Sequence, residues 1–431
     1  MKANTITLHR SRDSVRPELR AHEPGPRPTQ TREDNHVLSI IPRGEVIRNF
    51  IYSGCFDLVA NEIDLSLLSV GVHPDLADLL KGPSRSVFSL EDIRERWVVR
   101  FQREILDIAH GRWLWSKAAQ ERWRRRDYEA QNPRERIIRA AKKSLALCFA
   151  NDTGLNLLSK SERFCSRALN PTKMYIDLYE SVKPTIVFNG SHIHSAVATP
   201  AVQAAQWMGI PTATFIFSWD NLTSQGRIIL PYDYFLVWNE PLKNQLLEMY
   251  DHIKPENVFV TGSPQFDFHF RPEYYWTREQ FCSEIGADVD RPIILYTSGM
   301  ANHMPGEPEI VESIADMVND YSAPERPQLL VRVYAKDTTG RFEDLKSRRK
   351  DIIFQNVEWD PLWLTPKYDD TFALINTLRH CDLGINIAST ISLELCMFDR
   401  PVINVGYDPP FGSHLGLRNS RFYSFEHYKP V

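Results

Sequence analysis

An alternation of short apolar segments with segments of helical periodicity, which occurs twice, constrains this chain most. The first series lies in residues 184–265 and the second in residues 292–405. Apolar runs bounded by Gly, Pro or polar turns are typical of buried strands, and the segments between them have the spacing of amphipathic helices. Strands that alternate with helices predict βαβ units and parallel sheets. We therefore expect two successive α/β domains that bind ligands at the carboxyl ends of their strands.

The expected elements divide the chain into domains. Strands are expected at residues 37–41, 185–188, 212–217, 234–238, 258–261, 292–296, 328–334, 383–387 and 401–405, and a loop at 43–53. The main helices are expected at residues 199–208, 308–320, 371–379 and 389–398. This pattern predicts a first domain over 36–265, a linker at 266–284 and a second domain over 285–431.

Composition narrows the class of protein. Residues 1–35 are polar and rich in Arg and Pro, so we expect a disordered tail without the apolar stretch of a secretory signal. The six cysteines include no CxxC pair, which argues against a zinc site and a disulfide framework. The formal charge of −4 implies no polyanionic partner. These features predict a cytoplasmic protein with no bound metal and no nucleic-acid partner.

A basic helical segment interrupts the first domain at about residues 91–150. Between residues 112 and 143, eleven Lys or Arg accompany four acidic residues, and Trp113, Trp115 and Trp123 lie among them. Such a stretch is either a solvated helical face or a patch that docks on anionic lipid headgroups or an anionic acceptor. The second interpretation places the protein peripherally at the inner face of a membrane.

The strongest indication of a binding site in the second half of the chain is an expected strand, a turn that contains Ser and Thr, and a helix. It runs from Asp382 to Glu394, and Ser389 and Thr390 lie where the helix must be capped. The first N–H groups of a helix lack partners, so a diphosphate could accept hydrogen bonds from them and from both hydroxyls. Glu394 lies one turn along the same face and could accept hydrogen bonds from a ribose. Alternatively, Ser389 only caps the helix and Glu394 is solvated.

This segment resembles the donor-binding strand and helix of GT-B glycosyltransferases and of UDP-N-acetylglucosamine 2-epimerases. The likeness rests on the small turn, on Glu394 and on Pro401, which begins the next strand. Residues 260–267 resemble the end of the N-terminal domain of those proteins, and residues 293–299 resemble their first C-terminal strand and phosphate-facing loop. Residues 330–336 resemble the next strand, although Tyr and Ala replace the His and Pro that many relatives have there.

The resemblance covers about residues 180–405 and implies a GT-B fold of two facing Rossmann-like domains. It implies a nucleotide-sugar donor bound by Ser298, Gly299, Arg332, Ser389, Thr390 and Glu394. GT-B enzymes usually need no metal or other cofactor, because backbone N–H groups stabilise the leaving diphosphate. The family usually continues with further helices, so a chain that stops at Val431 implies a short or truncated second domain.

Two polar segments that follow strands of the first domain are candidates for the acceptor side. The segment from Phe217 to Gly226 is similar to one in surface-carbohydrate glycosyltransferases and glycerophosphotransferases, although a simple turn would also use its residue types. The residues expected in the cleft are Ser218, Trp219, Asp220 and Asn221. His192 and His194 follow the preceding strand and could act as the base that removes the acceptor proton, unless they are structural. Asp220 is the rival base.

The expected function is transfer of a sugar from a nucleotide-diphosphate donor to a surface polysaccharide or a lipid-linked acceptor. Three alternatives remain. The first is transfer of an alditol phosphate from a CDP donor. The second is 2-epimerisation of a UDP-sugar, for which the acidic residues and the His-Arg loop of the epimerases have no clear counterparts here. The third is a non-catalytic module that binds a nucleotide or a glycan, since fold alone does not imply catalysis.

Overall fold

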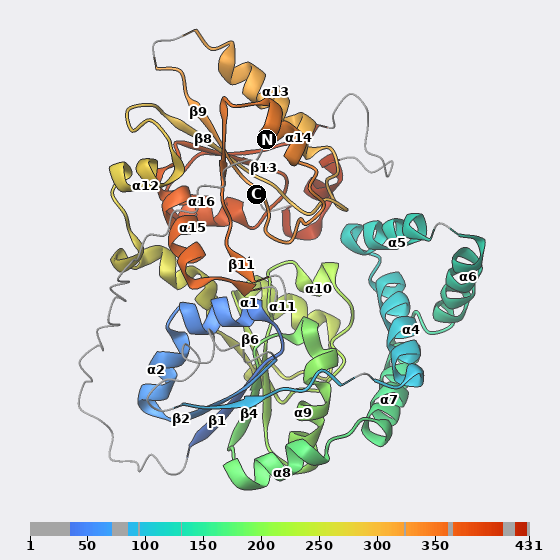
Figure 1. Ribbon diagram of the computed structural model, residues 1–431. Helices are drawn as coiled ribbons and strands as arrows, with labels where there is room; N and C mark the ends of the chain where they lie inside the picture. Colours follow the sequence, from blue (N-terminus) through green and yellow to red (C-terminus); the bar gives the residue numbers. More distant parts are fainter. Residues whose placement is uncertain are drawn as a thin grey trace, which may run out of the picture. The chain divides into compact units, whose positions relative to one another are not determined.

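The computed structural model describes residues 35–70, 85–93, 95–130, 132–322, 325–360, 365–407 and 419–428. The tail expected at residues 1–35 therefore lies outside the described residues, except for its last position. Two parallel sheets with helices packed against them form the described part of the chain (Figure 1). No helix within these residues is long and apolar enough to cross a membrane.

The first sheet has seven described strands in the order β3-β2-β1-β4-β5-β6-β7, and all neighbours are parallel. The strands are β1 (His36–Ile41), β2 (Asp64–Ser69), β3 (Arg85–Ser89), β4 (Ile186–Asn189), β5 (Thr212–Phe215), β6 (Tyr234–Val237) and β7 (Val258–Val260). The helices on this sheet are α2 (Cys55–Glu62), α8 (Lys173–Val182), α9 (Ser195–Trp207) and α11 (Glu240–Met249). Because parallel strands are covered on both faces, β1 and β2 read as nearly continuous apolar runs.

The second sheet has five described strands in the order β10-β9-β8-β13-β14, again all parallel. The strands are β8 (Ile293–Thr297), β9 (Gln328–Arg332), β10 (Ile352–Gln355), β13 (Leu383–Asn386) and β14 (Val402–Asn404). The helices are α12 (Arg278–Ile285), α13 (Glu307–Asn319), α14 (Glu343–Arg348), α15 (Tyr368–His380) and α16 (Ile391–Met397). The short strands β11 (Trp359–Asp360) and β12 (Thr365–Pro366) pair separately and antiparallel.

Both sheets reverse their winding direction once. The fourth strand of the first sheet, β4, lies beside β1, and the fourth of the second, β13, lies beside β8. In doubly wound sheets this reversal opens a crevice at the carboxyl ends of the two central strands, where ligands bind. Gly384 of β13 permits close packing there, because a Cβ atom would come within 2.2 Å of Leu395 Cδ1 on α16. The predicted α/β class with two parallel sheets is confirmed.

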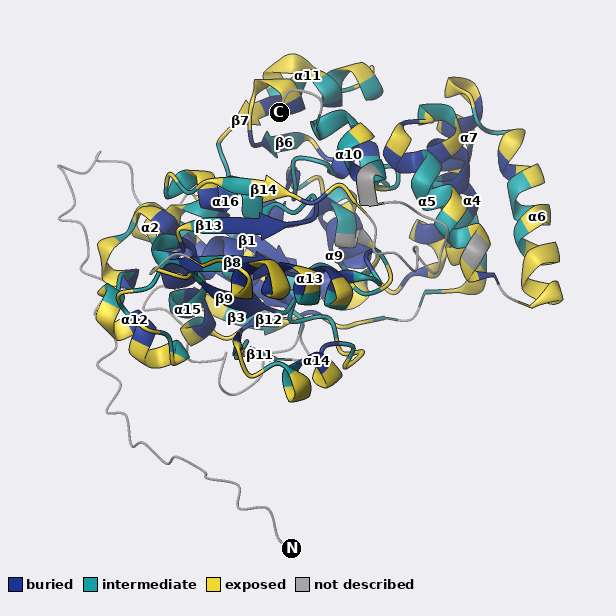
Figure 2. Ribbon diagram, turned by 90° about the horizontal axis from the view of Figure 1, so that it is seen from above, coloured by how far each residue is buried: buried dark blue, intermediate teal, exposed yellow. Residues whose placement is uncertain are grey.

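A helical unit is inserted between β3 and β4. It contains α4 (Trp97–Leu114), α5 (Lys117–Glu129), α6 (Pro133–Leu147) and α7 (Asp152–Leu169). Side chains of α4 and α7, among them Ile105, Leu106 and Leu155, form a small core of their own. Most of α6 is exposed along its length (Figure 2). The helical prediction for residues 91–150 is confirmed, and α7 extends the unit further.

Two segments differ from expectation. Residues 43–53 were expected as a loop but form α1 (Gly44–Val46) and the π-helix η2 (Ile47–Tyr52), because their apolar side chains, including Phe50, are buried in the first core. The segment expected as a linker contains the 3₁₀ helices η5 (Pro264–Phe270) and η6 (Pro272–Tyr274). Its Phe268 and Tyr274 are buried against Ile375 of α15, so it packs as part of the fold.

Candidate functional site

The turns after β8 and β13 begin at neighbouring positions of the second sheet. Thr297, at the end of β8, is in register with Asn386, at the end of β13. Ser298 and Gly299 follow the first of these strands, and Ser389 follows the second within three residues. The fold therefore brings both predicted phosphate-facing turns to the carboxyl edge at which the winding reverses.

The turn after β13 has an unusual backbone. Ala388 has a φ of +44°, in the left-handed region that residues other than Gly avoid. The Asn386 side chain holds this turn, since its Oδ1 accepts the Ser389 N–H at 3.0 Å and its Nδ2 donates to Ser392 Oγ at 3.0 Å. Backbone strain that is held by such contacts is concentrated at functional sites.

The two hydroxyls of this turn are placed differently. Ser389 Oγ accepts the N–H of Ile391 at 3.3 Å, so it caps the first turn of α16 locally. Thr390 is the N-cap residue, but its side chain makes no capping hydrogen bond. Contact between either hydroxyl and a diphosphate stays a prediction.

Glu394 is buried and paired, which neither sequence interpretation anticipated. Its Oε2 lies 2.9 Å from Nε2 of His269 on η5, and His269 is fully buried. Burial opposes ionisation of the carboxyl, but the hydrogen bond and charge of His269, with the charges of Arg48 and Arg332, outweigh it and lower the pKa of Glu394. Glu394 is thus an ionised carboxylate in a positively charged environment.

Arg48 also acts on Glu394, and it lies on the π-helix η2, which packs against the first sheet. Its guanidinium donates to Gln265 Oε1 at 3.2 Å and to Asn49 Oδ1 at 3.2 Å. Glu45 of α1, after a strand of the first sheet, pairs with Lys336 of the segment after β9 of the second sheet. We call Arg48, Gln265, His269 and Glu394 the switch-point cluster. Sequence reasoning missed its first three members, and the only available signal was their proximity to strand ends.

The other predicted donor residues have partners within the protein. The Arg332 guanidinium is buried and donates to both carboxylate oxygens of Asp370 at 2.8 and 2.7 Å. Ser298 Oγ accepts the Tyr334 N–H at 2.9 Å. The Gly299 N–H donates to the buried carboxylate of Glu307, and a Cβ at Gly299 would lie 2.5 Å from the Met304 sulfur. These residues hold the carboxyl edge of the sheet in shape.

His192 lies at the carboxyl edge of the first sheet, on the 3₁₀ helix η3 (His192–His194). It is buried, and its Nδ1 lies 3.3 Å from both the Phe215 carbonyl oxygen and the Phe217 nitrogen. Burial lowers its pKa to about 4, and the backbone contact and the charge of Asp220 raise it only partly. His192 and Asp220 are therefore close enough to interact. The side chain of His194 lies outside the described part of the structure.

The segment after β5 holds the remaining acceptor candidates. Asp220 precedes α10 (Asn221–Ser224), and its carboxylate accepts from Ser224 Oγ at 2.7 Å and from Asn221 Nδ2 at 3.3 Å. The Trp219 ring centroid lies 4.9 Å from that of His427 on η8 (Glu426–Tyr428). Ser218 is partly exposed, whereas Asn221 is buried. Residues 419–428 thus return to the acceptor segment, and Arg421 of η7 (Asn419–Ser424) also pairs with Glu121 at 2.9 Å.

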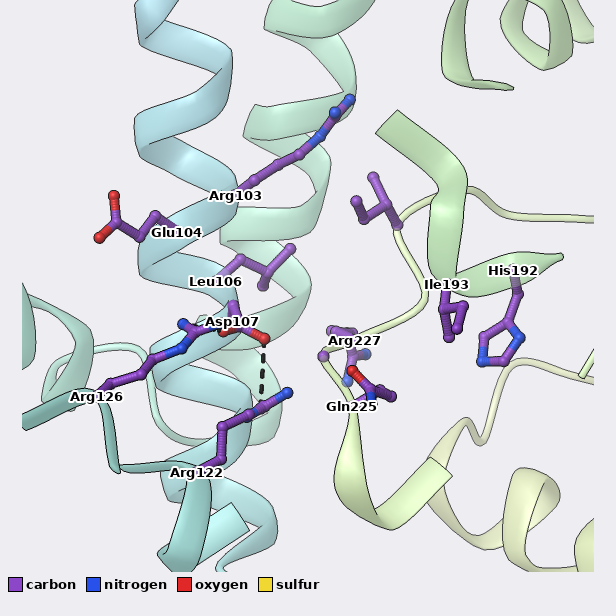
Figure 3. A pocket seen from close by; sticks show the side chains of 12 residues that line it. Arg103, Glu104, Leu106, Asp107, Arg122, Arg126, His192, Ile193, Gln225 and Arg227 are labelled. Atoms are coloured by element: carbon purple, nitrogen blue, oxygen red, sulfur yellow. Dashed lines mark hydrogen bonds and ion pairs between the residues drawn. The ribbon is translucent and has the colours of Figure 1, made fainter. Parts of the chain in front are cut away.

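A cavity of about 370 Å³ separates His192 from the helical unit. It is lined by Arg103, Glu104, Leu106, Asp107, Arg122, Arg126, His192, Ile193, Gln225, Gly226, Arg227 and Ile229. In Figure 3 Leu106 and Asp107 of α4 point towards the segment that carries Gln225 and Arg227, whereas Glu104 points away from it. Asp107 pairs with Arg122 at 3.3 Å and with Arg126 at 2.8 Å, so one carboxylate compensates part of the charge of these two arginines.

Much of the predicted basic patch at residues 112–143 is paired in the same way. Further ion pairs join Arg139 and Lys143 to Asp127, and Lys142 to Glu104. These contacts leave less free charge for a membrane than the sequence indicates, and membrane docking stays a prediction. Among the described residues, no cluster of three or more His, Cys, Asp or Glu is arranged to hold a metal ion.

Two doubly wound parallel sheets in one chain, with polar turns at the point of reversal, define the GT-B fold. Solved structures with this fold confirm the assignment. The UDP-GlcNAc 2-epimerase of Neisseria meningitidis, bound to UDP-GlcNAc, is 14% identical over 90% of this chain and 89% of its own, with a TM-score of 0.52. The MnaA protein of S. aureus with UDP is 11% identical over 90% of this chain and 86% of its own, with a TM-score of 0.51. No protein-family model and no curated sequence matches the chain.

Proposed function

We propose that this chain is a GT-B glycosyltransferase that binds a nucleotide-sugar donor at the switch-point cluster. The observation that carries the proposal is the ionised, buried carboxylate of Glu394 beside His269 and Arg48, at the edge where doubly wound sheets bind ligands. His269 contacts Oε2, which leaves Oε1 to accept hydrogen bonds from a ribose. The Arg48 guanidinium provides the positive charge that a diphosphate needs.

The first domain supplies the acceptor side in this proposal. The acceptor hydroxyl attacks the anomeric carbon, the bond from that carbon to the diphosphate oxygen breaks, and the diphosphate leaves with the electron pair. The acceptor proton passes to Asp220 or to a histidine of η3. His192, with its pKa lowered to about 4, is neutral near pH 7 but is a weaker base than an exposed imidazole. A surface polysaccharide or a lipid-linked glycan is the proposed acceptor, with the protein at the cytoplasmic face of the membrane.

A ligand screen tests the donor half of the proposal. Thermal unfolding of the whole chain is followed with UDP, GDP, CDP and their sugars, because a ligand that binds only the folded state raises the midpoint. We expect one nucleotide family to raise it, and the matching sugar to release nucleoside diphosphate when an acceptor is added. The exposed Glu309→Ala variant is the control, and Glu394→Ala should lose the shift. A screen in which no nucleotide moves the midpoint would rule out the proposal.

Epimerisation is the second candidate, because the similar solved structures include an enzyme named UDP-GlcNAc 2-epimerase. An epimerase inverts C2 of the sugar without an acceptor, whereas a transferase needs one. Proton NMR of UDP-GlcNAc incubated with the protein alone distinguishes them. Appearance of the C2 epimer would favour epimerisation, and an unchanged spectrum with acceptor-dependent release of nucleotide would favour transfer.

A further inference from the structure

A second cavity, of about 460 Å³, lies at the opposite edge of the first sheet. One wall is α7, and the other is formed by residues 227–231 and 250–253, which lead into β6 and towards β7. Because these segments precede their strands, the cavity is at the amino ends of the strands. It adjoins the first cavity, because Arg227 lines both, but neither His192 nor Asp220 is among its lining residues.

Basic residues outnumber carboxylates among the residues that line the cavity. Lys160 and Arg163 come from α7, and Arg227 and His252 come from the opposite wall. The single carboxylate in the lining belongs to Asp251, whose side chain is 93% exposed. Within the described residues no ion pair joins Arg163 or Arg227 to a carboxylate, in contrast to Arg122 and Arg126, which pair with Asp107.

These cations are close enough to oppose one another. Burial, and then the charges of Arg227 and Arg163, lower the pKa of His252. Burial also lowers the pKa of Arg163. The charge of Glu162 opposes this shift, and the charges of Arg167 and Arg227 add to it. Arg227 is held in place, because it donates to Asn156 Oδ1 at 3.3 Å and lies with its Cζ 4.9 Å from the centroid of the Tyr250 ring.

A buried hydroxyl in the same lining also lacks a partner. Ser159 of α7 is buried, and its Oγ has no hydrogen-bond partner among the described residues. Buried polar groups are nearly always hydrogen-bonded, so an unsatisfied hydroxyl beside two arginines that form no ion pair among the described residues indicates a missing acceptor. A phosphate group, with its negative charge and several acceptor oxygens, would satisfy both the hydroxyl and the guanidinium groups.

We propose that this cavity is a binding site for a phosphate-bearing ligand, distinct from the nucleotide-sugar site. Its volume is within the range of small-molecule pockets and exceeds one phosphate, so the ligand has a further group. The phosphate can belong to a soluble metabolite or to a phospholipid headgroup. Leu157 and Phe164 of α7 are 61% and 73% exposed next to the cationic residues, which gives the headgroup source a structural basis.

Calorimetric titration of the whole chain with inorganic phosphate and pyrophosphate tests the site. Arg163→Gln should weaken pyrophosphate binding by about tenfold or more, the loss expected for a charged hydrogen bond. The matched control is Arg167→Gln, an exposed residue on the same helix, which should change the affinity less than about twofold because exposed charges interact weakly in water. Ser159→Ala should cause a smaller loss. Circular dichroism checks that each variant is folded.

Two further experiments distinguish this site from the nucleotide-sugar site, and a lipid ligand from a soluble one. Arg48→Gln removes the charge that the nucleotide-sugar site offers a diphosphate, and it should retain the pyrophosphate binding that Arg163→Gln loses. The reverse result would assign pyrophosphate to the nucleotide-sugar site and overturn the proposal. Co-sedimentation with vesicles of phosphatidic acid in phosphatidylcholine tests a headgroup. Capture that depends on Arg163 identifies the lipid source, and Arg163-dependent binding of pyrophosphate alone identifies a soluble one. Equal binding by the Arg163→Gln and Arg167→Gln variants in both assays would overturn the proposal.

Discussion

The Nε2 atom of His269 lies 2.9 Å from Oε2 of Glu394, and this contact joins residues 125 positions apart. It connects η5, at the end of the first series of strands, to α16 of the second sheet. Both side chains are buried, so the pair is shielded from screening by solvent. The ionised state of Glu394 therefore depends on a residue that is distant in the sequence and that lies before the first strand of the second sheet.

Replacing Glu394 by Ala should weaken nucleotide binding by about 1–3 kcal/mol, the loss expected for charged hydrogen bonds to a ribose. Every nucleotide should be affected alike, since the ribose is common to all of them. Glu394→Gln should retain part of the affinity. Calorimetry with the cognate nucleoside diphosphate measures both variants, and Glu309→Ala serves as the exposed control. An unchanged affinity in a folded Glu394→Ala protein would show that α16 serves packing alone.

Removing the catalytic base should slow transfer by roughly 10²–10⁴ while donor affinity stays nearly constant. His192→Ala, His194→Ala and Asp220→Ala are the variants, assayed by release of nucleoside diphosphate at saturating donor and acceptor. A matched control is Glu180→Ala, an exposed residue of α8 away from the acceptor segment. If all three variants transfer at the rate of the unmodified protein, the base lies elsewhere.

His110 should make the protein sensitive to acid. It is fully buried in α4, neither ring nitrogen has a hydrogen-bond partner among the described residues, and burial lowers its pKa to about 3. The unfolded chain binds its proton near pH 6.5 and the folded protein does not, so the free energy of unfolding falls as the pH drops from 6.5 towards 3. His110→Leu should remove this part of the loss, as measured by urea unfolding between pH 7 and 4. A parallel pH dependence in the variant would contradict the assignment.

A side chain at position 384 should destabilise the protein unless the neighbouring Leu395 is replaced by a smaller residue. A Cβ atom there would lie 2.2 Å from Leu395 Cδ1 and 3.0 Å from its Cδ2. Gly384→Ala should lower the free energy of unfolding by about 1–3 kcal/mol, the usual result of overpacking. Because Leu395→Ala removes the clashing atoms, the double variant should lose less than the sum of the two single losses. Strictly additive losses would show that the clash is relieved elsewhere.

The exposed basic residues of the helical unit should bind anionic vesicles in proportion to the charge that remains unpaired. Each basic residue near the surface adds about 1 kcal/mol, and salt weakens the effect. Co-sedimentation with phosphatidylglycerol vesicles, compared with phosphatidylcholine vesicles, measures it. Arg134 forms no ion pair within the described segments, whereas Arg139 pairs with Asp127. We therefore expect the Arg134→Gln variant to bind anionic vesicles less than the Arg139→Gln variant. Equal recovery with both lipids would remove the membrane prediction.

Most strands and helices could be predicted because their signals are local. The apolar runs that became β8, β9 and β13 are bounded by turn residues, and the positions of Ser298 and Ser389 follow from strand ends alone. The partners of these residues could not be predicted in this way. His269 reaches Glu394, and Asp370 reaches Arg332, only through the packing of distant elements.

Local periodicity also failed where buried side chains determine an uncommon backbone. The π-helix over residues 47–52 has no distinctive sequence pattern, and packing of Ile47 and Phe50 in the first core determines it. Arg48, which this helix carries to the switch-point cluster, was missed for that reason. The count of basic residues at 112–143 misled in another way, because acidic partners such as Asp107 lie outside the counted segment.

The return of residues 419–428 to the acceptor segment has a consequence for biosynthesis. The rings of His427 and Tyr428 pack on that of Trp219. The ribosome adds these two residues roughly 200 positions after Trp219, which takes roughly 10–40 s at ordinary rates of translation. During that interval the nascent first sheet exposes Trp219 and the neighbouring face of α5 without their final cover. Newly made chains should therefore depend on chaperones that shield aromatic surface until synthesis has passed the last of these residues.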